Sequence, residues 1–165
     1  MNKTGNEMHK NAKKVVDIYE KSGMITTESN FNVPSGRKEE EMVKVGIIGA
    51  TGYAGGELVR ILANHKDAKI MWFGSRSYID KKYYEVYQNM FRIVDDICKD
   101  DNLAELAEQV DVIFTATPQG FLAGLLTEDI LSKVKIVDLS ADFRIKDVAV
   151  YEKWYGIEHK SPQFI

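Results

Sequence analysis

Short apolar runs separated by amphipathic segments dominate the chain from residue 42 onward. The first run, Val43–Ile48, is almost continuously apolar, which is typical of a strand buried on both faces of a sheet. The stretch Glu57–Asn64 that follows has the composition of a helix. The same reasoning predicts strands at Lys69–Phe73, Arg92–Ile97, Asp111–Ala116 and Lys135–Leu139, and helices at Leu103–Gln109 and near 121–132.

This alternation of strands and helices indicates the fold class. Strands that alternate with helices form a parallel sheet, because each helix carries the chain back to the start of the next strand. We therefore predict an α/β fold with a Rossmann-like, doubly wound, mostly parallel sheet. The chain has 165 residues, which is enough for one domain of ordinary size.

Residues 1–41 have a different pattern, and we expect them to form an N-terminal extension or linker. Met8, Ala12, Val15 and Tyr19 make one apolar stripe, which predicts a short amphipathic helix over roughly 7–22. Residues 24–41 have linker composition and end in the charge run 37–41. This run is either a solvated linker or the in-frame translation of a purine-rich ribosome-binding site, in which case the natural chain begins at Met42.

Composition narrows the possible partners. The net charge is −3, so nothing favours a nucleic-acid or an anionic-membrane partner. No stretch is long and apolar enough for a membrane span, and no secretory signal is visible, so we expect a cytoplasmic protein. Cys98 is the only cysteine, which excludes an internal disulfide and a cysteine-based metal site, and we predict no metal.

A glycine loop follows the first strand. Gly49, Gly52 and Gly55 give the spacing Gly-x-x-Gly-x-x-Gly between a strand and a helix. Glycines at this place let phosphate oxygens approach backbone N–H groups at the helix N-terminus. A tight turn without a ligand would need only one glycine. We therefore predict a dinucleotide site here that includes Gly49, Gly52, Gly55, Thr51, Tyr53 and Ala54.

The end of the second strand distinguishes the two nicotinamide cofactors. NAD-binding proteins carry an acidic residue at this place, which bonds to the ribose hydroxyl. Here the segment is Gly74-Ser75-Arg76-Ser77, with no acid. An arginine with flanking hydroxyls suits a 2′-phosphate, so Ser75, Arg76 and Ser77 favour NADP over NAD. The alternative is an exposed surface arginine.

Two further strand ends should reach the same crevice, because ligands collect at the carboxyl ends of parallel strands. Pro118 and Gly120 follow one strand, and Gly120 would allow close approach to a cofactor. Ser140 and Arg144 follow the next strand. Arg144 could bind a substrate phosphate or carboxylate, or it could pair with Asp142, and the spacing does not separate these alternatives.

Together these motifs closely resemble the N-terminal, NADP-binding part of N-acetyl-gamma-glutamyl-phosphate reductase. The resemblance rests on residues 42–58, Gly74–Ser77, the turn Thr117–Gly120, the segment 138–144, and 151–156 with His159. Single motifs are shared with aspartate-semialdehyde dehydrogenases, which is an alternative assignment. Gln119 departs from the family, where histidine is common. The resemblance implies that 42–165 is a partial dinucleotide-binding domain whose sheet is incomplete at the C-terminal end, with no substrate domain.

The resemblance also implies an activity: NADPH reduces N-acetyl-L-glutamyl 5-phosphate to the 5-semialdehyde and releases phosphate, in arginine biosynthesis. The family uses a cysteine nucleophile in an Asn-Pro-Gly-Cys-type motif, which we expect beyond Ile165, and its full-length enzymes are expected to be homo-oligomers. Cys98 is a poor substitute, because four neighbouring carboxylates disfavour a thiolate. His159 could serve as a general base, but a place at the surface or in packing is the expectation, and His65 is expected as a cap or solvent residue. The chain alone is therefore expected to be inactive. Alternatives are a stand-alone NADP-binding module and a non-functional fragment.

Overall fold

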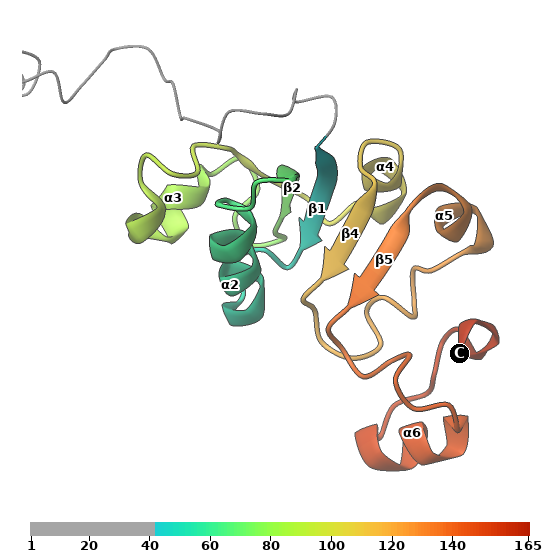
Figure 1. Cartoon of the computed structure of the whole chain (residues 1–165). Helices are drawn as coiled ribbons and strands as arrows, with labels where there is room; N and C mark the ends of the chain where they lie inside the picture. The colour runs from blue at the N-terminus through green and yellow to red at the C-terminus, as the bar shows by residue number, and fades with distance from the viewer. Residues whose placement is uncertain (1–41) are drawn as a thin grey trace, which may run out of the picture. The chain divides into compact units, whose positions relative to one another are not determined.

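The computed structural model describes residues 42–165, which form one five-stranded sheet (Figure 1). The strands are β1 (Val43–Ile48), β2 (Ala68–Gly74), β3 (Cys98–Lys99), β4 (Val112–Thr115) and β5 (Lys135–Asp138). They lie in the order β3-β2-β1-β4-β5, and all four neighbouring pairs are parallel. This confirms the predicted Rossmann-like, doubly wound fold. The predicted helix at 7–22 and the linker at 24–41 lie outside the described residues.

Helices cover both faces of the sheet. One face carries α2 (Tyr53–Leu62), α3 (Tyr83–Val86) and η2 (Gln88–Met90), and the other carries α4 (Leu103–Ala107) and α5 (Glu128–Lys133). The helix α6 (Val148–Tyr155) lies beyond the carboxyl ends of β4 and β5 in Figure 1, and the chain ends in η3 (Pro162–Phe164). The carboxyl edge of the sheet is therefore the edge where loops and α6 gather.

The alternation of side chains along β1 divides the hydrophobic core into two layers. Val45 and Ile47 pack with Val59 of α2 and with Tyr83 of α3. Ile48 belongs to the opposite layer, with α4 and α5. Because both faces of β1 are covered, its apolar run is nearly continuous rather than alternating.

Two predicted elements differ from the structure. Residues 92–97 are not a strand: Arg92 has a φ of +65°, and Ile97 makes only an isolated antiparallel bridge with Lys82 before β3 begins at Cys98. The predicted helix near 121–132 is only α5, because turns occupy 119–125 and the Thr127 side chain caps a new helix by accepting a hydrogen bond from the Ile130 N–H.

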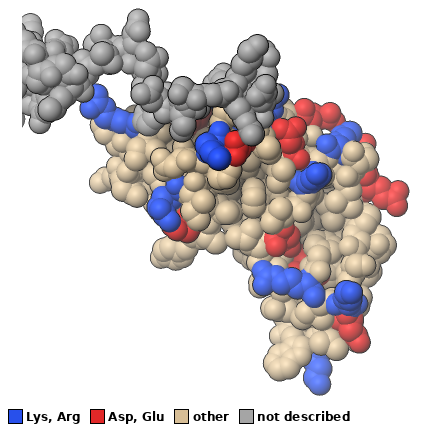
Figure 2. Space-filling view, in the orientation of Figure 1, with Lys and Arg blue, Asp and Glu red and all other residues tan. Residues whose placement is uncertain are grey.

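Charges of both signs are interspersed over the face shown in Figure 2, which has no extended patch of one sign. Within 42–165, none of the helices is long and apolar enough to cross a membrane. The described residues also include no group of three or more histidine, cysteine, aspartate or glutamate side chains arranged to hold a metal ion.

Candidate cofactor-binding site

The glycine loop connects β1 to α2 at the carboxyl edge of the sheet. Gly49 has a φ of +76°, and a Cβ there would lie 2.5 Å from the carbonyl oxygen of Ala116. A Cβ at Gly55 would lie 2.0 Å from the carbonyl oxygen of Gly49. These two glycines are therefore required by the fold itself, since the loop packs against both α2 and the end of β4.

Gly52 is different, because the fold would accept a side chain there. Its φ is −81°, and an added Cβ would meet its nearest neighbour, the Gly49 carbonyl oxygen, at an ordinary 3.4 Å. The residue is exposed and caps α2 without a side-chain hydrogen bond. The absence of a side chain at Gly52 leaves the N-terminus of α2 open to an external group, and this end of a helix attracts anions. The loop thus fits the pyrophosphate of a dinucleotide.

Of the other predicted loop residues, Tyr53 and Ala54 offer only their backbone to the site, and Thr51 offers a hydroxyl group as well. Tyr53 is 99% exposed and Ala54 is exposed too, so neither side chain is part of the hydrophobic core. The Thr51 and Ser75 hydroxyl oxygens lie 2.7 Å apart, which joins the loop to the end of β2. The Ala50 N–H donates to the Gly74 carbonyl oxygen at 2.8 Å. Two predicted parts of the site, the loop and the Gly74–Ser77 segment, therefore lie together.

Arg76 lies between two groups that the motifs in the sequence do not reveal, Asp101 and Phe121. Its Nε is 3.4 Å from Asp101 Oδ2, and its guanidinium carbon is 5.1 Å from the centroid of the Phe121 ring. The Arg76 side chain is 66% exposed, whereas that of Asp101 is 8% exposed. Burial raises the pKa of the Asp101 carboxyl, with Arg76 acting in the opposite direction. Ser75 is buried and Ser77 is exposed.

The turn after β4 is fixed by a buried carboxylate. Gly120 has a φ of +80°, and its N–H donates to both carboxylate oxygens of Asp142 at 2.9 Å. The Tyr151 hydroxyl donates to Asp142 at 2.7 Å. Pro118 and Gln119 are exposed. Asp142 thus joins the predicted Pro118–Gly120 turn to the segment that carries Ser140 and Arg144.

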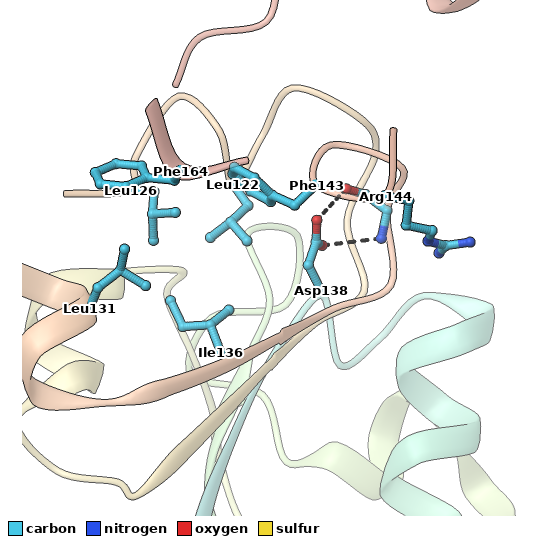
Figure 3. A pocket seen from close by; sticks show the side chains of 9 residues that line it. Leu122, Leu126, Leu131, Ile136, Asp138, Phe143, Arg144 and Phe164 are labelled. Carbon is cyan, nitrogen blue, oxygen red and sulfur yellow. Dashed lines mark hydrogen bonds between the residues drawn. The ribbon is translucent and has the colours of Figure 1, made fainter. Parts of the chain in front are cut away.

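Ser140 and Arg144 border a cavity of about 240 Å³ beside β5 (Figure 3). The buried Ser140 hydroxyl donates to Asp138, and Arg144 donates to the Leu139 carbonyl oxygen while its side chain remains exposed. The alternative in which Arg144 pairs with Asp142 is wrong, because Asp142 accepts its hydrogen bonds from other groups. The rest of the cavity is mostly apolar: Leu122, Leu126, Leu131, Ile136, Phe143 and Phe164.

Cys98 lies in β3, fully buried. Burial raises the pKa of its thiol to about 11, and Glu85 contributes further in the same direction. The predicted disadvantage for a thiolate is therefore present, but its main cause is burial rather than the four aspartates. A thiol in this state is neither accessible nor ionised at neutral pH, so it does not serve as a nucleophile.

The two histidines of the described region, His159 and His65, both bond to backbone groups of neighbouring segments. His159 is buried: its Nε2 lies 2.6 Å from the Asp142 carbonyl oxygen, and its Nδ1 accepts from the Ser161 N–H. Nε2 therefore carries the proton, and the ring packs edge-on against Phe143 and Tyr151. His65 is exposed after α2, where its Nδ1 accepts from the Asp67 N–H. His159 is thus a packing residue and not a surface one.

The five-stranded parallel sheet, the glycine loop after β1 and the arginine after β2 together define a nicotinamide-dinucleotide-binding domain. Residues 44–154 match the family described as semialdehyde dehydrogenase, NAD binding domain. The chain therefore belongs to the semialdehyde dehydrogenase family of oxidoreductases, and a nicotinamide cofactor is supported.

Curated relatives narrow the assignment within this family. The chain is 71% identical over 124 residues to N-acetyl-gamma-glutamyl-phosphate reductase of Lachnoclostridium phytofermentans, and 68% identical over 124 residues to the protein of that name in Lachnospira eligens. Both matches cover 75% of this chain and 36% of the relative, so the chain spans about a third of the length of these relatives. The resemblance predicted from the motifs is confirmed.

Among solved structures, the chain is similar to an aspartate semialdehyde dehydrogenase with NADP from Candida albicans. The two are 20% identical, with a TM-score of 0.47, and the match covers 65% of this chain and 32% of the other.

Proposed function

We propose that this chain binds NADPH and supplies the cofactor-binding part of an N-acetyl-gamma-glutamyl-phosphate reductase. The whole enzyme would reduce N-acetyl-L-glutamyl 5-phosphate to the 5-semialdehyde and release phosphate. The observation that carries the proposal is the open N-terminus of α2 at Gly52, with Arg76 at the end of the neighbouring strand. The names of the relatives support the choice of substrate.

The preference for NADPH rests on Arg76. The end of β2 carries no acidic side chain that would bond to a ribose 2′-hydroxyl. The contact with Asp101 uses the Nε of Arg76, and the exposed side chain leaves its two Nη groups for a phosphate. A guanidinium can bind a phosphate through two parallel hydrogen bonds, which supports binding of a 2′-phosphate.

The cofactor would supply the hydride for the reduction. The residues of this chain would bind and orient it: the glycine loop at its pyrophosphate, Ser75, Arg76 and Ser77 at its adenosine end, and the Pro118–Gly120 turn near the nicotinamide. Ser140 and Arg144 would face the substrate phosphate from the rim of the cavity. Because Cys98 is buried and protonated, we propose that the chain alone does not catalyse the reduction.

Fluorescence of Trp72 gives a direct test of cofactor binding. Trp72 is buried, and its Nε1 donates to the Asp100 carbonyl oxygen next to Asp101, so a nucleotide bound at Arg76 would quench it. We expect NADPH to bind about 10-fold more tightly than NADH, since one charge-assisted pair contributes about 1.5 kcal/mol. Arg76→Ala should remove that preference.

Arg60→Ala is the matched control for Arg76→Ala. Arg60 is an exposed arginine in α2 that pairs with Glu57 and makes no contact with the glycine loop. Its replacement should leave both affinities unchanged. Equal binding of NADPH and NADH by the unaltered chain would contradict the assignment of Arg76 to the 2′-phosphate. Oxidation of NADPH by the purified chain with N-acetyl-L-glutamyl 5-phosphate would contradict the proposed inactivity.

A further inference from the structure

We propose that Tyr83 and Tyr87 are positioning residues that direct the N–H groups of the glycine loop toward the pyrophosphate of the cofactor. The proposal rests on the cofactor binding proposed above and assigns a role to two side chains outside the loop. Both come from the segment after β2, 33 to 36 positions along the chain from the loop residues to which they bond.

The two phenols bond to three consecutive carbonyl groups of the loop. The Tyr83 hydroxyl donates to the Ala50 carbonyl oxygen at 3.0 Å. The Tyr87 hydroxyl lies 3.2 Å from the Thr51 carbonyl oxygen and 3.1 Å from that of Gly52, and donates to both. The whole turn from Ala50 to Gly52 is thus held from the side of α3.

The direction of the carbonyl groups decides the direction of the N–H groups. In a trans peptide the C=O and the following N–H point in opposite directions. Since the carbonyls of residues 50–52 point toward the phenols, the N–H groups of residues 51–53 point to the other side. The Gly52 N–H donates to the Gly49 carbonyl oxygen at 3.0 Å, while those of Thr51 and Tyr53 have no acceptor within residues 42–165. These two are free to bond to an anion.

Both phenols are themselves held in place. Tyr83 is fully buried, with its ring 5.3 Å from that of Phe73 and 5.5 Å from that of Tyr87. Burial raises the pKa of Tyr83, so its hydroxyl remains a donor at neutral pH. A Cβ at Gly56 would lie 3.0 Å from the Tyr87 Cζ and from its hydroxyl oxygen, so Gly56 gives this ring its room. Prior ordering of a loop lowers the entropy lost on binding.

Tyr84 provides a natural comparison, because it lies between the two in the chain and faces away from the loop. Its ring makes an edge-on contact with Phe91 at 5.1 Å, and Lys82 Nζ lies 5.6 Å from its centroid. Removal of the Tyr84 hydroxyl therefore changes the same helix without changing the loop.

The experiment compares Tyr87→Phe with Tyr84→Phe in the full chain, with Trp72 fluorescence as the readout. For Tyr87→Phe, we expect the Kd values of NADPH and NADH both to rise about 5- to 10-fold, the effect of one hydrogen bond. Their ratio should stay unchanged, because both nucleotides contain the pyrophosphate. Adenosine 2′-monophosphate, which lacks the pyrophosphate, should bind as before. Tyr84→Phe should leave all three affinities unchanged.

The outcomes separate this proposal from the proposed function. Affinities of Tyr87→Phe within two-fold of the unaltered chain overturn the positioning role, as does an equal loss of adenosine 2′-monophosphate binding. An unaltered chain that binds NADPH and NADH equally overturns the NADP preference alone, and one that binds neither overturns both proposals. If Tyr87→Phe does not fold, Gly56→Ala is the second variant, because its Cβ displaces the same ring. It should weaken NADPH and NADH equally and leave binding of adenosine 2′-monophosphate unchanged. Any other result for Gly56→Ala counts against the proposal.

Discussion

The glycine loop and the segment from Asp138 to Arg144 lie at the same edge of the sheet, but they are built in different ways. The loop contains no charged side chain and is shaped by glycines and by hydrogen bonds to its carbonyl groups. The second segment is built on the carboxylates of Asp138 and Asp142, which accept hydrogen bonds from Thr115, Ser140, Gly120 and Tyr151.

This difference shows which groups remain available to a ligand. The loop directs its hydrogen bonds so that N–H donors stay open at one side, as an anion site requires. In the second segment the donors already bond to the carboxylates of Asp138, which is half-buried, and Asp142, which is buried, so Asp142 serves the fold. Arg144, which is exposed at the rim of the cavity, is the charged side chain there that remains open to a ligand.

Replacement by alanine should affect stability at Gly55 of the loop and NADPH binding at Gly52. Gly55→Ala places a Cβ 2.0 Å from a backbone oxygen, so we expect the free energy of unfolding to fall by about 3 kcal/mol or more. Gly52→Ala meets its nearest atom at an ordinary 3.4 Å and should keep its stability within about 0.5 kcal/mol, yet lose NADPH binding at least about 10-fold. Urea denaturation and fluorescence titration measure the two effects. A Gly52→Ala chain that binds NADPH normally would show that the loop is only a turn.

In the second segment, replacement of one carboxylate should weaken the fold. Asp142→Asn removes the charge shared by three donors, the N–H groups of Gly120 and Ala123 and the Tyr151 hydroxyl. The Gly120 N–H bonds to both carboxylate oxygens, so it would face the NH₂ group of the new amide. We expect a loss of about 2–3 kcal/mol in the free energy of unfolding, and about 1 kcal/mol for Tyr151→Phe, which removes one donor. Chemical denaturation measures both. Unchanged stability of Asp142→Asn would show that these hydrogen bonds do not support the segment.

The Cys98 thiol should be almost unreactive in the folded chain. Its pKa rises from 9.0 to about 11, which lowers the thiolate fraction about 100-fold at neutral pH, and burial slows access further. Iodoacetamide should therefore label the native chain at least about 100-fold more slowly than the chain in urea. Because the folded pKa is the higher one, the contribution of this thiol to the free energy of unfolding should be constant below pH 9.0 and decrease as the pH rises toward 11. Rapid native labelling would reopen Cys98 as a nucleophile.

Arg144→Ala should have the smallest effect on this chain. The side chain is exposed and makes one hydrogen bond, to the Leu139 carbonyl oxygen. We expect a stability change within about 0.5 kcal/mol and unchanged affinity for NADPH, as measured by thermal unfolding and fluorescence. A large loss of either would place Arg144 with Asp142 in the fold and not at the substrate.

The positions of the strands could be predicted from the sequence, because a buried strand requires only a short run of apolar residues. The strands β1, β2, β4 and β5 are short apolar runs, and their positions were predicted to within a residue or two at each end. The helix α6 was missed although Asp147 caps its start and Gly156, with a φ of +68°, ends it. The strand expected at Arg92–Ile97 was wrong because β3 is only two residues long and depends on its pairing with β2.

Only the loops of the candidate site could be predicted from the sequence. Glycine spacing pointed to the loop, but it could not separate Gly52, which the fold would allow to change, from Gly49 and Gly55, which it would not. The roles of Tyr83, Asp101 and Asp142 depend on contacts between residues that are distant in the chain. The pattern Lys82–Tyr87 with three tyrosines was visible, but nothing in it showed which of the hydroxyls reach the loop.

The place of β1 at the centre of the sheet has a consequence for local unfolding. β1 has parallel partners on both sides and helices on both faces, so its amide protons should be among the slowest to exchange with solvent. The glycine loop is the direct continuation of that strand. Openings that fray β3 or β5 at the sheet edges should therefore leave the base of the loop intact, even where they release Asp101 and Arg144, which follow those two strands.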